Sequence, residues 1–202
     1  KKFALNFINK FDDYIKKRKT INQFFFSRHK KTTLSNKIFL GQKLDPNIID
    51  KKNQSEFIKI NFDNCFSSPA SRCFDTAKIV YSKRKIIVSN YLKEIDYGDV
   101  EGSTVKELSQ KYPNIPKMWN LGLDPKFPNG ESLKDVSIRL DKFLKQIIKM
   151  VSISKKSNYL IFSHNVVLRC LIGKIFKFLR WNSALYKEKV YGRFASCHKW
   201  QI

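Results

Sequence analysis

The chain has 202 residues and a mass of 23.8 kDa, which is enough for one domain with a full hydrophobic core. Apolar residues make up 42% of it, including 17 phenylalanines, and this composition indicates a folded globule. Forty basic residues against 17 acidic ones give a formal net charge of +23, so polyanions are attracted non-specifically. The basic residues are mostly lysines scattered through every segment, and no nucleic-acid-binding motif accompanies them. We therefore expect compositional bias rather than a specific nucleic-acid surface.

No apolar run approaches the roughly 18 to 20 residues that a membrane span requires. The first 20 residues contain Asp12, Asp13 and seven basic residues, so they do not resemble a secretory signal. These observations predict a soluble, cytoplasmic protein. Because the chain begins with lysine rather than methionine, a missing N-terminal partner domain stays open. A homodimer stays open as a separate alternative.

The four cysteines show neither a C-x-x-C pair nor the spacing of a zinc site. They are Cys65, Cys73, Cys170 and Cys197. The first three fall in segments that look buried, and we expect free thiols of a reducing compartment.

In chain order, residues 1–20 have apolar side chains at helical spacing and predict an amphipathic helix that precedes the domain formed by residues 21–202. Strands are predicted at 23–27, 64–67, 85–89, 158–163 and 194–202. Helices are predicted at 70–82, 104–112, 132–151 and 166–178. Residues 111–130 hold four prolines and two glycines and predict an excursion over the sheet edge. Alternating strands and helices favour a three-layer α/β/α sandwich with a mostly parallel central sheet.

Arginine, histidine and glutamate side chains follow these strands. Arg28 and His29 come directly after the first strand, Arg72 comes just after the second, Glu94 lies beyond the third, and His164 ends the fourth. Since the carboxyl ends of parallel strands meet at one edge of a sheet, both histidines are predicted to lie at the same rim. Arginine forks match phosphate oxygens bidentately, and helix N-termini add N–H donors. The arrangement predicts a pocket for a phosphate dianion.

These segments resemble the motifs of the histidine phosphatase superfamily, which has the phosphoglycerate mutase-like fold. The family's R-H-G-x-T motif corresponds to R-H-K-K-T at 28–32, and its S-S-P-x-x-R-x-x-x-T-A motif corresponds to residues 67–77. Its L-x-E-x-x-x-G-x-x-E-G motif corresponds to residues 92–102, its G-E-S to 130–132, and its S-H to 163–164. The ordered set spans residues 24–169 and leaves the N-terminal helix uncovered.

The resemblance implies a role for each matching residue. It implies that His29 is the nucleophile that becomes phosphorylated, and that Glu94 donates a proton to the leaving oxygen. Arg28, Arg72 and His164 are implied to clamp the equatorial phosphate oxygens. The implied substrate contacts are Thr32, Asn36 (or Ser35, one residue out of register), Gly41, Tyr97 and the backbone of Asn165. The substrate is implied to be a small phosphorylated molecule, with no metal and no cofactor.

One residue departs from the family pattern, since Lys30 replaces the usual glycine. Glycine there indicates a positive φ or a close ligand, so lysine predicts a reshaped loop with an ammonium at the phosphate pocket. Glu101 and Glu131 are expected to cap or to pair with basic side chains, and His198 is expected to be a core or surface histidine.

Within the family, the similarity of residues 99–104 to the phosphatase branch favours hydrolysis, and residues 111–129 lack the paired arginines that mutases use. A phosphoglycerate mutase-type phosphotransferase stays open as the first alternative. A polyanion-binding pseudoenzyme is the second, since the charge is high and Lys30 is unusual. The complete set of arginines, histidines and Glu94 argues against it, because a carboxylate repels a bound phosphate.

Overall fold

The computed structural model describes residues 22–51, 61–82, 85–150, 157–175 and 198–201. The predicted N-terminal helix over 1–20 lies outside the described residues, as does Cys197.

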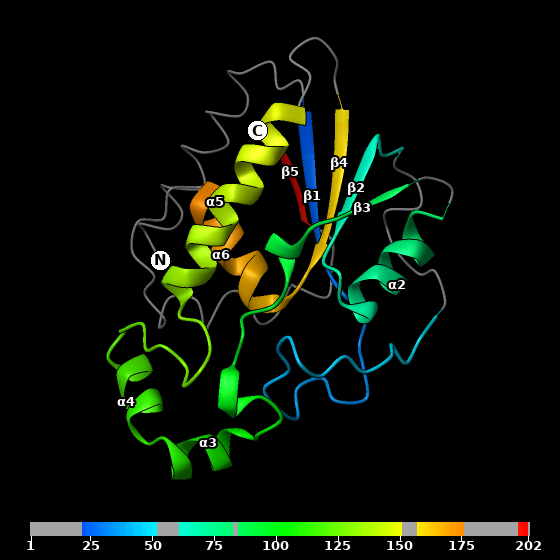
Figure 1. The fold of residues 1–202 in the computed structure, drawn as a ribbon. Helices are drawn as coiled ribbons and strands as arrows, with labels where there is room; N and C mark the ends of the chain where they lie inside the picture. The colour runs from blue at the N-terminus through cyan, green and yellow to red at the C-terminus, as the bar shows by residue number, and fades with distance from the viewer. Residues whose placement is uncertain (1–21, 52–60, 83–84, 151–156, 176–197, 202) are drawn as a thin grey trace, which may run out of the picture.

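A five-stranded sheet forms the centre of the molecule (Figure 1). Its strands are β1 (Asn22–Arg28), β2 (Asn64–Ser67), β3 (Ile86–Val88), β4 (Ser157–Ser163) and β5 (His198–Gln201). The order across the sheet is β3-β2-β4-β1-β5, and every pair is parallel except β1 with β5. The predicted mostly parallel sheet is therefore confirmed, with an antiparallel strand at one edge.

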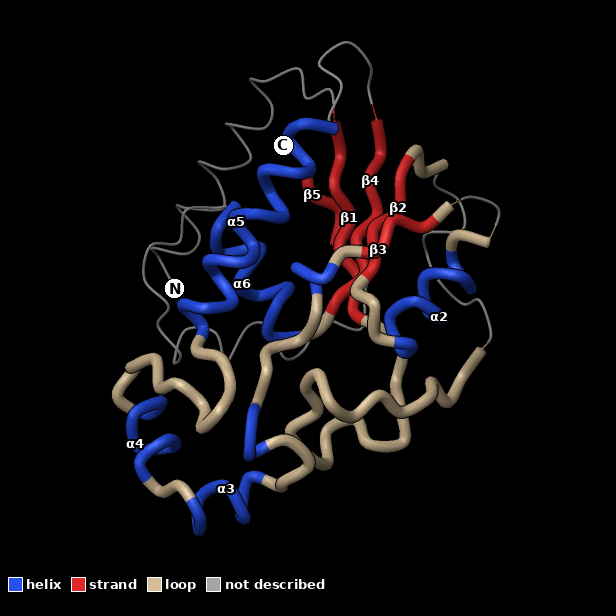
Figure 2. The backbone as a smooth tube through the Cα atoms, in the orientation of Figure 1, coloured by secondary structure: helices blue, strands red, loops and turns tan. Residues whose placement is uncertain are grey.

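Helices cover both faces of this sheet (Figures 1 and 2). Helix α2 (Ser71–Val80) lies on one face, and helices α5 (Leu133–Met150) and α6 (Asn165–Ile175) lie on the other. Successive side chains of β1 point to alternate faces. Phe24 and Phe26 pack in the cluster that contains Phe143 of α5. Phe25 packs in the cluster that contains Ala77 of α2. Because successive strand residues point to opposite faces, these two clusters form the two interfaces of a three-layer sandwich.

Most predicted helices and strands are present with ends shifted by one to three residues, but the excursion at 111–130 differs from the prediction. It contains an additional helix, α4 (Asn114–Asn120), which follows α3 (Val105–Lys111). Pro116 is the third residue of α4, where its missing N–H would have had no partner within the helix, so the proline is tolerated. Figure 1 shows α3 and α4 next to each other, away from the sheet.

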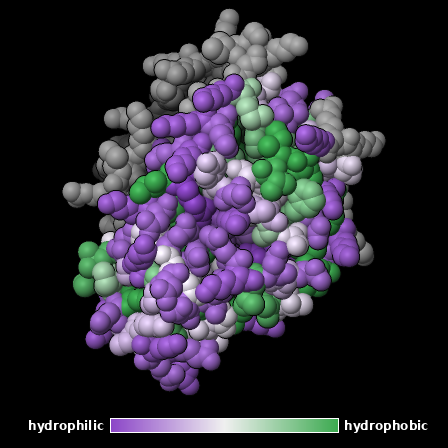
Figure 3. Space-filling model, viewed as in Figure 1, coloured by the Kyte–Doolittle hydropathy of each residue, from purple (hydrophilic) through white to green (hydrophobic). Residues whose placement is uncertain are grey.

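Two short 3-10 helices connect β3 to α3, namely η2 (Asn90–Leu92) and η3 (Gly98–Val100). The face of the molecule in Figure 3 is mostly hydrophilic with small apolar patches. None of the helices in the described part of the chain is long and apolar enough to cross a membrane.

Candidate active site

The register of the sheet brings three polar segments to one edge. Arg28 at the end of β1 pairs with Ser163 at the end of β4, and Ser67 of β2 pairs with Phe162. The backbone N–H of His29 donates to the carbonyl of Ser163 at 3.1 Å, which extends the ladder by one residue. The predicted meeting of the strand ends is therefore present in the structure.

His29 is held in one tautomer. Its Nδ1 lies 2.7 Å from the carbonyl oxygen of Lys30, and a carbonyl only accepts, so Nδ1 carries the proton. The other nitrogen, Nε2, is left with a lone pair. Burial, the nearby Arg28 guanidinium and the charge of Arg72 lower the pKa of His29 to about 3, so the ring is neutral at physiological pH. A neutral imidazole with a free Nε2 is the nucleophilic form.

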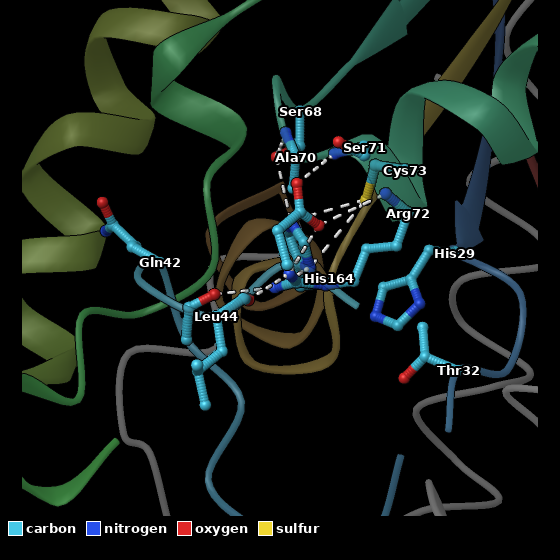
Figure 4. Close-up of polar contacts among 12 residues, drawn as sticks. His29, Thr32, Gln42, Leu44, Ser68, Ala70, Ser71, Arg72, Cys73 and His164 are labelled. Atoms are coloured by element: carbon cyan, nitrogen blue, oxygen red, sulfur yellow. Dashed lines mark hydrogen bonds and ion pairs between the residues drawn. The ribbon is translucent and has the colours of Figure 1, made fainter. Parts of the chain in front are cut away.

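His164 lies beside it at the end of β4, with the two ring centroids 5.2 Å apart (Figure 4). Its Nδ1 is 3.3 Å from Nη2 of Arg72, and its Nε2 is 2.9 Å from Oγ of Ser68. Since arginine only donates, Nδ1 of His164 accepts and Nε2 donates to the serine. Burial, together with His29 and the arginines, lowers the pKa of His164 well below its usual range. His164 is therefore a neutral donor and acceptor that joins β2, β4 and α2.

The two arginines leave donors unused. Among the described residues, Nε of Arg28 and Nε of Arg72 are buried and have no hydrogen-bond partner. A buried N–H without a partner costs free energy, roughly 1–3 kcal/mol, and such groups in a cleft indicate a place for an acceptor. Both arginines also lower the pKa of His29, so their charge acts at this ring.

Glu94 follows η2 and is 6% exposed. Burial raises its pKa, although hydrogen bonds from the backbone of Ile95 and Val166 and the charges of Arg28 and Arg72 oppose that rise. A raised pKa keeps a carboxyl protonated to a higher pH, as a general acid requires.

Two side chains hold the backbone of Glu94 in place. Gln42 Nε2 donates to its carbonyl oxygen at 2.8 Å, and Nη2 of Arg139 donates to the same oxygen at 3.1 Å. Arg139 in turn makes a bidentate ion pair with Glu131, at 2.8 and 3.1 Å. Arg139 was not among the residues predicted from the sequence. It lies three residues after the buried Val136 on α5, where an arginine beside an apolar stripe indicates a buried partner.

The N-terminus of α2 and the fork of Arg72, which the sequence predicts to face phosphate, are hydrogen-bonded to Asp45 in this structure. Asp45 accepts hydrogen bonds from the backbone N–H groups of Ser71 at 2.6 Å and Arg72 at 3.4 Å, and from Nη1 of Arg72 at 3.1 Å. Burial alone would raise the pKa of Asp45, but these bonds outweigh it and lower the pKa. An anionic side chain thus occupies the helix start, because a carboxylate is stabilised there like a phosphate.

A pocket of about 200 Å³ opens beside Glu94. Its lining is formed by Gly41, Gln42, Asp45, Ser68, Pro69, Ala70, Lys93 and Glu94. Glu94 therefore forms part of the pocket wall.

The five predicted substrate contacts are placed differently. Gly41 lines the pocket, and Asn165 begins α6 directly after His164. Thr32 is buried and bonds to Ser35 Oγ through both its N–H and its hydroxyl. Tyr97 packs with its ring 5.1 Å from Phe39 and 4.9 Å from Phe127, in an aromatic cluster.

Asn36, the remaining predicted contact, is not among the residues that line the pocket beside Glu94. It is exposed in a turn with φ 65°, a left-handed conformation that asparagine adopts more readily than most residues. The other candidate at this position, Ser35, is buried.

The motif position of Lys30 predicts an ammonium at the phosphate pocket, but in the structure this ammonium pairs with the carboxylate of Asp50. Its Nζ lies 3.3 Å from Asp50, and its backbone N–H donates to Thr76 Oγ1 at 2.9 Å. The non-glycine residues with positive φ are Asn36 and Asn129 in the described ranges, so Lys30 needs no glycine-like conformation. Its carbonyl is what orients His29, and any residue supplies a carbonyl.

The described cysteines Cys65, Cys73 and Cys170 are free and buried, as predicted. Burial raises the pKa of Cys73, whose Sγ lies 3.4 Å from Nε2 of His164, so this thiol is a packing neighbour rather than a nucleophile. In the part of the chain that the structure describes, no group of three or more His, Cys, Asp or Glu side chains is placed to hold a metal ion.

Comparison with known proteins supports the interpretation of this geometry. The family model described as "Histidine phosphatase superfamily (branch 1)" matches residues 49–184, about two thirds of the chain. The match includes Arg72, Glu94 and His164, whereas Arg28 and His29 precede it and are placed by the structure.

Two curated relatives show the range of activities in this family. The chain is 29% identical over 137 residues to phosphoserine phosphatase 1 of Hydrogenobacter thermophilus, covering 63% of this chain and 64% of the relative. It is 28% identical over 123 residues to 2,3-bisphosphoglycerate-dependent phosphoglycerate mutase 2 of Gloeobacter violaceus, covering 57% and 55%. The chain thus spans a little over half of the length of these relatives.

Among solved structures, a putative α-ribazole-5'-P phosphatase of Escherichia coli superposes with a TM-score of 0.66 at 23% identity, covering 75% of this chain and 78% of that one. This likeness shows the fold. With the family model matched over most of the described domain, the chain belongs to the histidine phosphatase superfamily, branch 1.

Proposed function

We propose that the protein hydrolyses a small phosphomonoester through a phosphohistidine formed on His29. One observation carries the proposal: His29 is neutral with a free Nε2, and the two arginines that lower its pKa each have a buried Nε without a partner in the described residues. A nucleophile without charge beside unused cationic donors fits a phosphate dianion.

The first chemical step forms a nitrogen–phosphorus bond. The lone pair of His29 Nε2 attacks phosphorus in line while the bond to the ester oxygen breaks. Arg28 and Arg72 offset the charge on the equatorial oxygens, and protonated Glu94 gives its proton to the leaving oxygen. The alcohol product then leaves through the pocket that lies against Glu94.

The second step returns the site to its first state. Glu94, now a carboxylate, takes a proton from water as the water oxygen attacks phosphorus. The nitrogen–phosphorus bond breaks, and its electron pair returns to Nε2 of His29. Inorganic phosphate leaves, Glu94 is protonated again, and the Nδ1–H bond to Lys30 has been kept throughout.

The phosphotransferase alternative uses the same first step and passes the phosphoryl group to a second hydroxyl. It is supported by the similarity to a phosphoglycerate mutase. We favour hydrolysis because residues 111–129, which include α4, contain no arginine to hold a second anionic group. Product analysis separates the two, since hydrolysis releases inorganic phosphate in step with substrate loss.

The proposal is tested by trapping the intermediate. Mixing the protein with ³²P-labelled substrates from a panel of sugar phosphates, phosphoglycerates and phosphoamino acids and quenching within one turnover should give an acid-labile, base-stable adduct. His29→Ala should remove the adduct, and His198→Gln, which removes a histidine of β5, should keep it. Label on His164 or on a serine would contradict the proposed role of His29.

A further inference from the structure

We infer that Glu101 is a positioning residue, which acts on catalysis by holding residues 41–45, here named the strap, against Arg72. This inference rests on the proposed function. The strap crosses the site between α2 and the loop that carries Glu94, and it contacts both of them.

The strap uses three of the five N–H hydrogens of Arg72. Nη1 donates to the carbonyl of Leu44 at 2.9 Å and to the carboxylate of Asp45 at 3.1 Å, and Nη2 donates to the carbonyl of Gly41 at 2.7 Å. The remaining Nη2 hydrogen faces Nδ1 of His164 at 3.3 Å. The guanidinium is therefore fixed in its plane, and among the described contacts its Nε–H is the one donor left for a substrate oxygen.

Glu101 fixes the strap through four consecutive backbone N–H groups. Its Oε1 accepts from Gly41, Lys43 and Leu44 at 3.2, 2.8 and 2.7 Å, and its Oε2 accepts from Gln42 at 3.1 Å. Successive N–H groups that converge on one anion form a nest, and a carboxylate is a strong acceptor for it. Two of these four residues, Gly41 and Leu44, turn their carbonyls toward Arg72.

The fit around Glu101 is tight at Gly41. A Cβ added to Gly41 would lie 2.8 Å from Oε2 of Glu101 and 2.9 Å from the carbonyl oxygen of Ile95. One contact is with backbone, which cannot swing aside. Glycine at position 41 therefore lets the strap approach Glu101 and Arg72 at once.

The strap also reaches the proton donor. Gln42, whose N–H is held by Glu101, donates from its side chain to the carbonyl of Glu94 at 2.8 Å. One carboxylate thus supports the orientation of both the phosphate clamp and the general acid. Misplacing a reacting group by about 1 Å costs up to about 100-fold in rate, so the loss of Glu101 should be measurable far from the reacting atoms.

The test compares variants that loosen the strap with a matched control. Glu101→Ala removes all four bonds, Glu101→Gln keeps an oxygen for the three donors at Oε1, and Gly41→Ala displaces the strap without changing charge. Glu107→Ala is the control, because Glu107 is also a carboxylate that accepts a backbone N–H, but it caps α3 and does not contact Arg72. Each variant is measured for kcat/KM, for affinity toward inorganic phosphate and vanadate, and for thermal unfolding.

We expect Glu101→Ala and Gly41→Ala to lower kcat/KM by about 10- to 100-fold and to weaken vanadate binding, with a smaller loss for Glu101→Gln and none for Glu107→Ala. In an Arg72→Ala background, adding Glu101→Ala should lower kcat/KM by less than about threefold, because the side chain that the strap orients is already gone. Losses that multiply in the double variant, or full activity of both Glu101→Ala and Gly41→Ala, would overturn the inference. If no substrate is turned over, vanadate affinity still tests it, and failure to bind vanadate at all would overturn the proposed function as well.

Discussion

His29 should stay neutral in mildly acidic solution, and this can be tested by lowering the pH from 7.5 to 5. With the pKa of His29 at about 3, about 99% of the ring is neutral at pH 5. An imidazole at its ordinary pKa of 6.5 would be only about 3% neutral at that pH. The nucleophile is therefore about 30-fold more available than an unperturbed histidine would be, and acidification alone should not silence it.

The same pKa shift has a stability cost with a definite sign. Because the folded pKa lies below the unfolded one, the unfolded chain binds more protons between pH 6.5 and pH 3, and stability is lost as the pH falls through that window. For His29 alone, linkage gives a loss of about 2 kcal/mol between pH 7.5 and pH 5. His164, whose pKa is also lowered by burial, adds a loss in the same direction.

Two measurements check this prediction. The chain has only three histidines, so imidazole NMR signals can be assigned with His29→Asn and His164→Asn, and the His29 signal should not titrate between pH 5 and pH 8. Urea unfolding at pH 7.5 and pH 5 should show a stability loss that is about 2 kcal/mol smaller in His29→Asn than in the parent. A His29 signal that titrates near pH 6.5, with equal losses in both proteins, would refute the reasoning.

Four further predictions concern catalysis, metal, charge and folding. Glu94→Gln should slow hydrolysis of an alkyl phosphate by about 10²- to 10⁴-fold and that of p-nitrophenyl phosphate much less. It should also remove the fall in activity as the pH rises through the raised pKa of Glu94. Equal losses on both substrates would contradict the acid role. Activity should survive EDTA, and a complete loss restored by Mg²⁺ would contradict the proposed site. Arg72→Ala should strongly lower the rate of hydrolysis while salt-sensitive retention on nucleic acid stays nearly unchanged, as expected for a scattered charge of +23. A parallel loss of retention would place the charge effect in the site. Thr104→Ala breaks the capping box of α3 and should lower the free energy of unfolding, measured in urea, by about 1 kcal/mol. Ser109→Ala, at an exposed position of the same helix, is the control. Equal effects of the two substitutions would argue against the cap.

The sequence by itself determined the sheet and the edge at which the chemistry lies. Apolar runs that end in Arg28-His29 and Ser163-His164 predict buried parallel strands, because such strands are covered on both faces, and their carboxyl ends must meet. His29, Arg72, Glu94 and His164 could be named before the fold was known, since each follows a strand at a motif position. Local pattern also placed most helices to within a few residues.

Only the tertiary structure decided the state of these groups. The tautomer of His29 depends on the Lys30 carbonyl, and its pKa depends on burial, which no local pattern reports. Asp45 reaches the start of α2 from 26 residues away along the chain, and no periodicity or spacing signals such a contact. Hydrogen bonds between distant loops are chosen by packing in three dimensions, and residues of any type supply backbone carbonyls. For this reason the sequence predicts which side chains gather at the site, whereas the fold alone determines which of their donors are already used.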